Sequence, residues 1–599
     1  MMPQQAVAMG WQHLQSGNVA AAEAVVRPLL MHGMSGELVP LLAAIRLNQA
    51  RFSEAAPLFE QARLLQPAVG RFAYFHGAAL AGMAQFEQAV SAYQTAIKQE
   101  PNFADSYIAL GQAQRKLGQL EQAQNTYRKL LRIQPNNADG YVALASVLAE
   151  TGQLVQAEAP LRRALQYARS PQEQAGIHNN LAITLDHQNR HAEALESLER
   201  AQALAPEIPG LDSRRIDTLF QLGRFEDCLA LYKKMLDRDP ADVRAHGAYN
   251  SLLYRLGRED EYLTSYDRAP QTREILICKA AMLTLQKRGA EAQSVYDSLL
   301  ARDPLDMAAA AGWANSLMLT GRYSESVAAF ENVITRSGDD PALLSSAAAA
   351  ALLGGDPQKA EHFCQLGLRN KPHDQNCLAL LGTAWRLQDD EQDETLNGYD
   401  SLIRVFDMEP PDGFSSMEDF NAELGAYLAR LHPQTGAYLE QSLRGGTQTE
   451  GSLFGAGHPL VEKLRTRIEQ AVSAFVAGLP GDEQHPFVGR RANKFRYAGA
   501  WSSLLRDQGF HVNHLHPLGW ISSCYYVTVP EATKDPDSRN GWIKFGEPAL
   551  DVPLKNAIRR AVQPIPGRLV LFPSYMWHGT VPLRAPSVRT TIAFDVVPE

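Results

Sequence analysis

The chain has 599 residues, more than one hydrophobic core normally serves, so we expect several domains or a repeat array joined to a domain. Hydrophobic residues make up 45% and charged residues 21%, which is typical of a folded globular protein and not of a disordered one. The net charge of −9 comes from 57 basic and 66 acidic residues without a basic block, which argues against nucleic acid as a partner.

The N-terminal stretch MMPQQAVAMGWQHLQSG has neither a positively charged region nor a continuous apolar run, and no later stretch has eighteen uninterrupted apolar residues. We therefore expect no signal peptide, no membrane partner and a cytoplasmic location. The five cysteines are scattered and include no C-x-x-C pair, so we expect reduced thiols.

The first two thirds of the chain repeat at a fixed period. Pro67, Pro101 and Pro135 follow one another at intervals of 34 residues, and further prolines recur more loosely up to Pro372. This is the period of the tetratricopeptide repeat, a helix-turn-helix unit that stacks into a solenoid. The pattern covers roughly residues 5–388, with a degenerate unit around 245–300. It predicts an all-α solenoid over 1–390 whose groove binds a protein or peptide partner, although such arrays also serve as scaffolds or for homo-oligomerisation.

The unit from Ala104 to Pro135 indicates how paired helices pack. Gly111 and Ala123 are small enough to let the two helices approach closely. Tyr107 and Tyr127 then fill the space between them.

The texture of the sequence changes after residue 390. MEPPDGF, at 408–414, indicates a linker, which we place at 391–415. Helical patterns return over 416–480. Over 481–599, short β-branched and aromatic stretches such as GWISSCYYVTV and GRLVLFP alternate with Gly and Pro turns. The predicted fold class is therefore a multidomain chain: an all-α tetratricopeptide-repeat solenoid followed by an α+β domain, 416–599, with a double-stranded β-helix (jelly roll) core.

The stretch HVNHLHPLGW, 511–520, holds three of the chain's sixteen histidines within six positions. Side chains two apart on an extended segment point the same way, so His514 and His516 can face one cavity, as can His511 and Asn513. An isolated histidine more simply caps a turn, but three so close together favour a metal site. His578, directly after the strand GRLVLFP, is the candidate for a third ligand.

Four motifs occur in order over about 416–599: SLRGGTQTEGSLF (442–454), NHLHPLGWISSCYYV (513–527), GWIKFGEP (541–548), and PGRLVLFPSYMWHGTVP followed by Arg589. With them the sequence resembles the bacterial 2-oxoglutarate and Fe(II)-dependent oxygenases that are fused to N-terminal tetratricopeptide repeats. The resemblance implies that Fe(II), 2-oxoglutarate and O₂ are the cofactor and cosubstrates, and that His514, His516 and His578 are the catalytic metal ligands. It further implies that Arg589 and Tyr526 bind the far carboxylate of 2-oxoglutarate.

The sequence departs from the usual His-x-Asp or His-x-Glu motif of these oxygenases, because no acid stands in the equivalent place. With His516 there, the protein side of the site is neutral. If His511 and Asn513 are the aligned pair instead, Asn513 is a weak ligand. We favour His514 and His516 because HLHP directly precedes the next strand.

Several other residues near these motifs call for an interpretation. Asp507 and Glu547 are carboxylates that could join the site only if folding brings them near. Arg568 and Lys544 are interpreted as surface charges, and Trp577 as a wall that keeps water from the site. GGTQT is interpreted as a Gly-rich turn that positions a loop over the pocket.

These observations predict a dioxygenase that oxidatively decarboxylates 2-oxoglutarate and hydroxylates a C–H bond of a substrate, a polypeptide or carrier recruited by the repeats. Two other interpretations remain: a non-catalytic repeat scaffold with a degenerate jelly roll, and a cupin-like metalloprotein without 2-oxoglutarate. The sequence contains no G-x-x-x-x-G-K-[ST], H-E-x-x-H or G-x-S-x-G motif, which argues against nucleotide hydrolysis, zincin proteolysis and serine hydrolysis.

Overall fold

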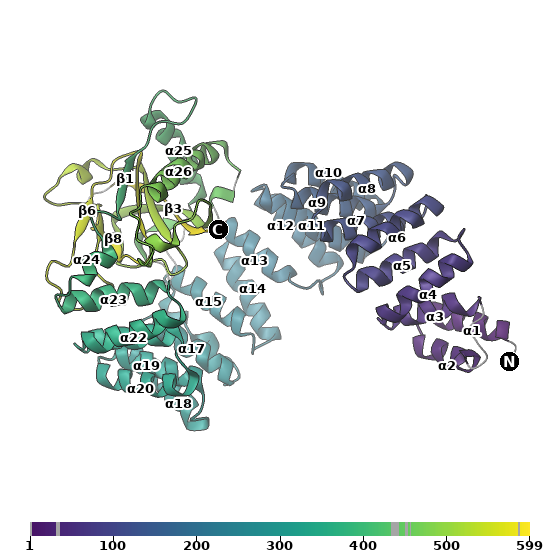
Figure 1. Cartoon of the computed structure of the whole chain (residues 1–599), viewed down its shortest axis with the longest axis horizontal. Coiled ribbons are helices and arrows are strands. Elements are labelled where there is room, and N and C mark those ends of the chain that lie inside the picture. Colours follow the sequence, from purple (N-terminus) through teal and green to yellow (C-terminus); the bar gives the residue numbers. More distant parts are fainter. Residues whose placement is uncertain (1–2, 31–35, 433–441, 450–452, 456, 585–586) are drawn as a thin grey trace. The chain divides into compact units, whose positions relative to one another are not determined.

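The structure is a computed structural model that describes residues 3–30, 36–432, 442–449, 453–455, 457–584 and 587–599. The chain divides into two compact units, Met1–Arg224 and Phe225–Glu599. The helical solenoid and the antiparallel sheets that follow it, coloured from purple to yellow along the chain, confirm the predicted fold class (Figure 1).

The first unit consists of stacked helix pairs. Its helices are α1 (Pro3–Gln15), α2 (Val19–Leu30), α3 (Leu38–Asn48), α4 (Phe52–Leu65), α5 (Gly70–Gly82), α6 (Phe86–Gln99), α7 (Ala104–Lys116), α8 (Leu120–Ile133), α9 (Ala138–Glu150), α10 (Leu154–Tyr167), α11 (Pro171–His187), α12 (His191–Leu204) and α13 (Leu211–Gln221). A glycine makes the close approach within the pair α7 and α8: a Cβ at Gly111 would lie 2.3 Å from the ring of Tyr127. The expected packing role of these two residues is therefore observed.

The second unit begins with more helices of the same kind. They are α14 (Phe225–Arg238), α15 (Val243–Arg255), α16 (Thr264–Arg268), α17 (Arg273–Leu285), α18 (Gly289–Arg302), α19 (Met307–Leu319), α20 (Tyr323–Ser337), α21 (Pro341–Leu353), α22 (Pro357–Asn370), α23 (Gln375–Leu387) and α24 (Gln392–Asn397). Aspartate side chains cap several of these helices at their N-termini. Asp340, for example, directly precedes Pro341, the first residue of α21, and its side chain accepts from the Ala342 amide. The short α16 lies in the region where the sequence indicated a degenerate repeat.

The remaining part of the second unit carries the sheets and two supporting helices. Its elements are β1 (Arg404–Asp407), α25 (Met417–Leu431), β2 (Leu443–Gln448), α26 (Pro459–Ala477), β3 (Phe495–His511), β4 (Ile521–Thr528), β5 (Ile543–Phe545), β6 (Arg560–Val562), β7 (Arg568–Pro573), β8 (His578–Thr580) and β9 (Arg589–Pro598). A six-stranded sheet has the order β1-β7-β4-β9-β3-β2, a three-stranded sheet has the order β6-β5-β8, and all pairs are antiparallel.

One hydrophobic core joins the large sheet to its helices. Phe420 of α25 and Ile468 of α26 are fully buried in the same cluster as Ile592 and Phe594 of β9. Leu378 of α23, a repeat helix, belongs to this cluster as well. The last repeat and the sheet domain are therefore stabilised by shared apolar burial.

The segment expected as a linker, 391–415, contains α24 and the edge strand β1. β1 pairs with β7, with Val405 opposite Val570, and the carbonyl of Leu396 in α24 accepts from the Tyr575 hydroxyl at 2.6 Å. The division at 390 and 416 stays a prediction, but much of the segment between them is ordered structure packed on the sheet domain.

GGTQT differs from the expected turn. Its first four residues, 445–448, lie in β2, which pairs with β3 and shifts register between Arg444 and Gly446. A Cβ at Gly446 would lie 2.3 Å from the Leu504 carbonyl oxygen, so the glycine permits close backbone approach at this irregularity.

Among the helices of the described residues, none is long and apolar enough to cross a membrane.

Candidate metal centre

The backbone holds two of the predicted ligands side by side. His514 lies between β3 and β4, and His578 begins β8. The His514 amide donates to the His578 carbonyl at 2.9 Å, and the His578 amide donates back at 3.0 Å. His516 is tied to the same neighbourhood, because its amide donates to the Ser574 carbonyl at 2.9 Å. Two segments that are far apart in the sequence thus meet in one place.

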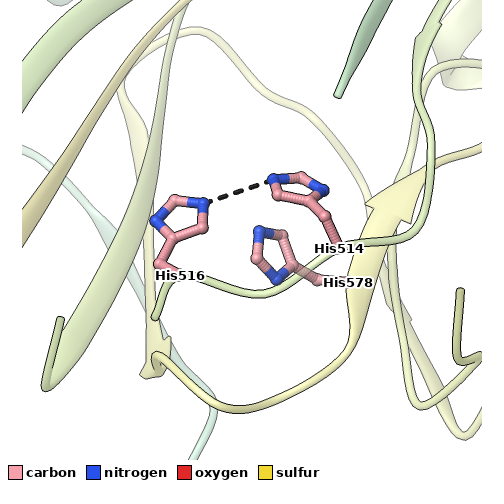
Figure 2. A group of neighbouring side chains, drawn as sticks. All are labelled: His514, His516 and His578. Atoms are coloured by element: carbon pink, nitrogen blue, oxygen red, sulfur yellow. Dashed lines mark hydrogen bonds between the residues drawn. The ribbon is translucent and has the colours of Figure 1, made fainter. Parts of the chain in front are cut away.

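The three imidazoles converge on one point, as Figure 2 shows. Ring centroids are 4.2 Å apart for His514 and His578, 5.0 Å for His516 and His578, and 5.2 Å for His514 and His516. One ring nitrogen from each residue lies within 4.8 Å of the other two. The Nε2 atoms of His514 and His516 are 3.2 Å apart. Two nitrogens that each bind one ion at about 2.1 Å are about 3.0–3.4 Å apart at right-angled to tetrahedral bond angles, so the spacing suits a shared ion.

The other nitrogen of each ring has an acceptor. His514 Nδ1 donates to the Val512 carbonyl at 2.8 Å, and His578 Nδ1 donates to the Met576 carbonyl at 2.9 Å. His516 Nδ1 donates to the Asp595 carboxylate at 2.6 Å. Because carbonyl and carboxylate oxygens only accept, the hydrogen lies on Nδ1 in each ring, and each Nε2 presents a lone pair to the centre.

Burial keeps the rings of His514 and His578 neutral. It is the main cause that lowers the pKa of His514 to about 3, and the neighbouring His516 adds to it. Burial likewise holds the pKa of His578 well below its usual value. Metal ions bind neutral imidazole, so these two ligands are already in the binding form at neutral pH.

Asp595, in β9, is the residue of this centre that sequence reasoning missed. Its side chain is largely buried, and Oδ1 also accepts from the Ser522 hydroxyl at 2.6 Å. It is one acid in the otherwise apolar and hydroxylated strand RTTIAFDVV, which is the signal that could have drawn attention to it.

The alternative ligands do not join the three histidines. The His511 ring is 6.0 Å from that of His514, and its Nδ1 contacts the Ser442 hydroxyl at 3.2 Å. Asn513 donates from its side-chain amide to the Pro548 carbonyl at 3.2 Å. Glu547 pairs with Lys544. The side chain of Asp507 lies outside the described residues.

Arg589 opens β9 and is 2% exposed. One guanidinium nitrogen donates to the Gly541 carbonyl, while Nε has no hydrogen-bond partner among the described residues. Within the same ranges, Arg589 forms no ion pair. Burying a guanidinium without a carboxylate partner lowers the stability of the fold, and a bound anion would offset that loss.

Tyr526 is fully buried in β4, with the Arg589 guanidinium carbon 5.6 Å from its ring centroid. Its hydroxyl has no hydrogen-bond partner in the part of the chain that the structure describes. Burial is the main cause that raises the pKa of Tyr526 well above its usual value, with the Cys524 thiol contributing, so the phenol stays protonated and can donate.

A cavity of about 290 Å³ contains the centre. His514, His516 and His578 line it together with Arg589, whereas Tyr526 does not. The volume is close to the lower end of the range for small-molecule sites, about 300–1,000 Å³. A small ligand can therefore contact the imidazoles and the guanidinium at once.

Trp577 does not wall off the cavity, in contrast to the expectation. Its indole N–H donates to the Ala379 carbonyl at 3.2 Å and to the Thr383 hydroxyl at 3.1 Å, both in α23. Alternation explains the difference, because neighbours on an extended segment face opposite ways and His578 faces the cavity. Arg568, interpreted as a surface charge, has a side chain that is 16% exposed and pairs with the exposed Asp407.

Comparison with protein families matches both parts of the chain. Residues 499–595 match the family described as "Putative 2OG-Fe(II) oxygenase". Residues 80–146, 142–207, 214–274, 286–341 and 311–374 match tetratricopeptide-repeat families. The oxygenase match covers three of the four motifs that carried the resemblance, and SLRGGTQTEGSLF, at 442–454, lies outside it.

Three individual relatives illustrate the likeness of the repeats. The anaphase-promoting complex subunit cut9 of Schizosaccharomyces pombe is 24% identical over 176 residues, which are 28% of this chain and 26% of that protein, so the chain spans about a quarter of the length of this relative. A thermophilic TPR protein of Thermus thermophilus is 24% identical, with 31% of this chain and 99% of that chain covered and a TM-score of 0.26. Pseudomonas aeruginosa pilF is 17% identical, with 36% and 96% covered and a TM-score of 0.31.

Proposed function

Because the chain joins N-terminal tetratricopeptide repeats to a C-terminal 2OG-Fe(II) oxygenase domain, we propose that it is a 2-oxoglutarate-dependent dioxygenase that hydroxylates a substrate delivered by the repeats. Fe(II) held by His514, His516 and His578 would supply oxidative decarboxylation of 2-oxoglutarate by O₂, coupled to hydroxylation of a C–H bond. The converging Nε2 lone pairs support this ligand set.

One observation carries the cosubstrate assignment: the buried guanidinium of Arg589, without a carboxylate partner, in the same cavity as the imidazoles. A planar guanidinium binds a carboxylate through two parallel hydrogen bonds. Arg589 would hold the far carboxylate of 2-oxoglutarate while the keto acid end faces the histidines. This also argues against a non-catalytic scaffold, in which a buried charge without a counter-charge would only lower stability.

Tyr526 is proposed as the second donor to that carboxylate. Its buried hydroxyl has no hydrogen-bond partner among the described residues, and its ring contacts the Arg589 guanidinium. Because Tyr526 is not among the residues that line the cavity, its contribution should be smaller than that of Arg589, and Tyr526→Phe should weaken 2-oxoglutarate binding only about 2–10-fold.

The repeats would recruit a polypeptide or carrier and raise its concentration near the cavity. A cytoplasmic location belongs to the same proposal, since all five cysteines are free and a reducing compartment keeps them so.

Turnover of 2-oxoglutarate in the absence of substrate tests the proposed activity. Full-length protein is incubated with Fe(II), O₂, 2-oxoglutarate and ascorbate, which supplies the two electrons that a substrate would otherwise give, and succinate is measured. We expect slow succinate formation that is abolished in His578→Ala. In Arg589→Ala the KM for 2-oxoglutarate should rise about 10–100-fold, the equivalent of losing one hydrogen bond between charged groups.

Arg568→Ala is the matched control, because it removes an arginine of the same domain that pairs with an exposed aspartate, and it should leave the KM unchanged. Iron binding without succinate would favour a cupin-like metalloprotein. No iron binding at all would favour the scaffold.

A further inference from the structure

We infer that Asp595 is a positioning residue for the metal centre: it fixes the tautomer and orientation of His516 and supplies the negative charge that the coordinating residues lack. The inference rests on the proposed metal site and assigns a role to a carboxylate that lies outside it. No carboxylate belongs to the converging group in the part of the chain that the structure describes.

The three ligand rings differ in what holds them. Backbone carbonyls of Val512 and Met576 accept from His514 and His578, and both acceptors lie two residues before the ring they hold. His516 bonds instead to a distant side chain, because its Nδ1 reaches across to β9, seventy-nine positions along the chain, at 2.6 Å. Its orientation therefore depends on one side chain.

The carboxylate is itself held in place. Ser522 of β4 donates to the same oxygen at 2.6 Å, and the Ser522 hydroxyl contacts that of Ser574 at 2.8 Å. Ser574 also accepts the His516 amide through its carbonyl. Asp595 lies opposite Ser522 in the register of β4 and β9, so strand pairing sets the position of the acceptor. A buried network that is connected in this way is rigid.

Charge explains why a carboxylate is used here. Three neutral imidazoles leave a divalent ion with its full charge, whereas a carboxylate bonded to the far nitrogen of one ring raises the basicity of that ring and offsets part of the charge. Asp595 lines the cavity but does not belong to the converging group, and its Oδ1 is engaged by His516 and Ser522, so in this inference it acts through His516. The negative charge that the His-x-Asp motif would supply would thus come from a carboxylate hydrogen-bonded to a ligand.

Titration with Co(II) tests the inference, because Co(II) is stable in air and its visible absorption reports on coordination. Full-length, chelator-treated wild type, Asp595→Asn, Asp595→Ala and His578→Ala are compared, with Asp407→Asn as a control that removes an exposed carboxylate of the same domain. Asp595→Asn keeps the shape and an acceptor oxygen but removes the charge. Far-UV circular dichroism and the thermal midpoint of the apo-proteins are recorded alongside.

We expect one Co(II) per wild-type chain and about 10–100-fold weaker binding in Asp595→Asn, with an altered visible band and an unchanged apo fold. Asp595→Ala should bind more weakly still, and Asp407→Asn should match wild type. Equal Co(II) affinity and an identical visible band in Asp595→Asn would overturn the inference about Asp595 but leave the proposed metal site standing. Failure of the wild type itself to bind would overturn the proposed metal site, and the two failures are therefore distinguishable.

Discussion

The repeat helices of the two units pack against different partners. In Met1–Arg224 helices pack against neighbouring helices, as the core cluster over α8–α13 illustrates. In Phe225–Glu599 the last repeat helices pack against sheet residues too: Trp577 contacts the clusters of both α21–α23 and the large sheet, and Leu550 and Val552 join the former. The first unit is a solenoid alone, whereas in the second unit the last repeat helices form part of the hydrophobic core of the sheet domain.

The last repeat helices and the sheet domain match different families, yet they share side-chain contacts and a hydrophobic core. Arg386 of α23 donates to the carbonyls of Gly546, Asn556 and Ala557, which belong to the segment between β5 and β6. Trp577, next to the proposed ligand His578, donates to α23. The final repeats thus help to position the metal centre as well as to extend the array.

Deletion of the repeats should have the largest effect on the second unit. A chain that begins at residue 416 lacks α23, α24 and β1 and exposes the core they cover, so we expect it to aggregate or to lose near-UV circular dichroism and Co(II) binding. A chain that begins at Leu211, and so keeps the repeat matched at 214–274, should retain both. Folding and metal binding by the shorter chain would show that the shared core is dispensable.

Two glycine substitutions should separate the stabilities of the two units. A Cβ would lie 2.3 Å from the Tyr127 ring at Gly111 and 2.2 Å from the Tyr296 ring at Gly312. Each change to alanine should therefore cost about 1–3 kcal/mol by overpacking. In urea unfolding, Gly111→Ala should move the transition of the first unit and Gly312→Ala that of the second. A shift of one common transition by both variants would mean that the units unfold together.

Acid should act on the second unit through His432, whose ring contacts the hydroxyls of Ser502 and Thr447. Burial, with the charge of Arg506 second, lowers the pKa of His432 to about 4. Between a pH of about 6.5, the ordinary histidine pKa, and about 4, the unfolded chain binds this proton and the folded chain does not. Stability therefore falls as the pH falls, by at most about 1.4 kcal/mol per unit.

His432→Gln should reduce this slope by the contribution of one proton, because the buried His514 and His578 still contribute with the same sign, while the pH dependence of the first unit stays as in wild type. Unfolding free energies measured in urea at several pH values give both slopes. An unchanged slope in the variant would mean that the ring is not the group that titrates.

The smallest effect is expected from Trp577→Phe, which keeps an aromatic ring but removes the donor to α23. The loss should be about 1 kcal/mol in the second unit. Co(II) affinity should fall by less than about tenfold, because His578 keeps its backbone bridge to His514. A loss as large as that in His578→Ala would show that the repeat helix controls the metal centre directly.

Periodicity and motif order were enough to predict the solenoid, the antiparallel β-rich domain and the gathering of His514, His516 and His578. Local patterns carried the solenoid and the pairing of His514 with His516, since the 34-residue period and the spacing of two along an extended segment are visible in the sequence, whereas His578 was assigned from its place after a strand and from the resemblance to the oxygenases. The order of the strands within each sheet could not be predicted from local patterns, because β1 pairs with β7 across a long stretch of intervening chain.

The role of Asp595 was equally beyond the sequence. Its pairing with His516 depends on the register between β4 and β9, which alternation of side chains does not specify. Trp577, which directly precedes β8, was assigned to the cavity because it neighbours His578, although alternation along an extended segment places neighbours on opposite faces.

An anaerobic titration of the full-length protein with Fe(II) and 2-oxoglutarate, followed by visible absorption, asks whether the histidines and Arg589 form one cosubstrate site. We predict a metal-to-ligand charge-transfer band that is absent in His578→Ala and weakened in Arg589→Ala but unchanged in Arg568→Ala. Iron bound to the wild type with no band at saturating 2-oxoglutarate would contradict the proposed site.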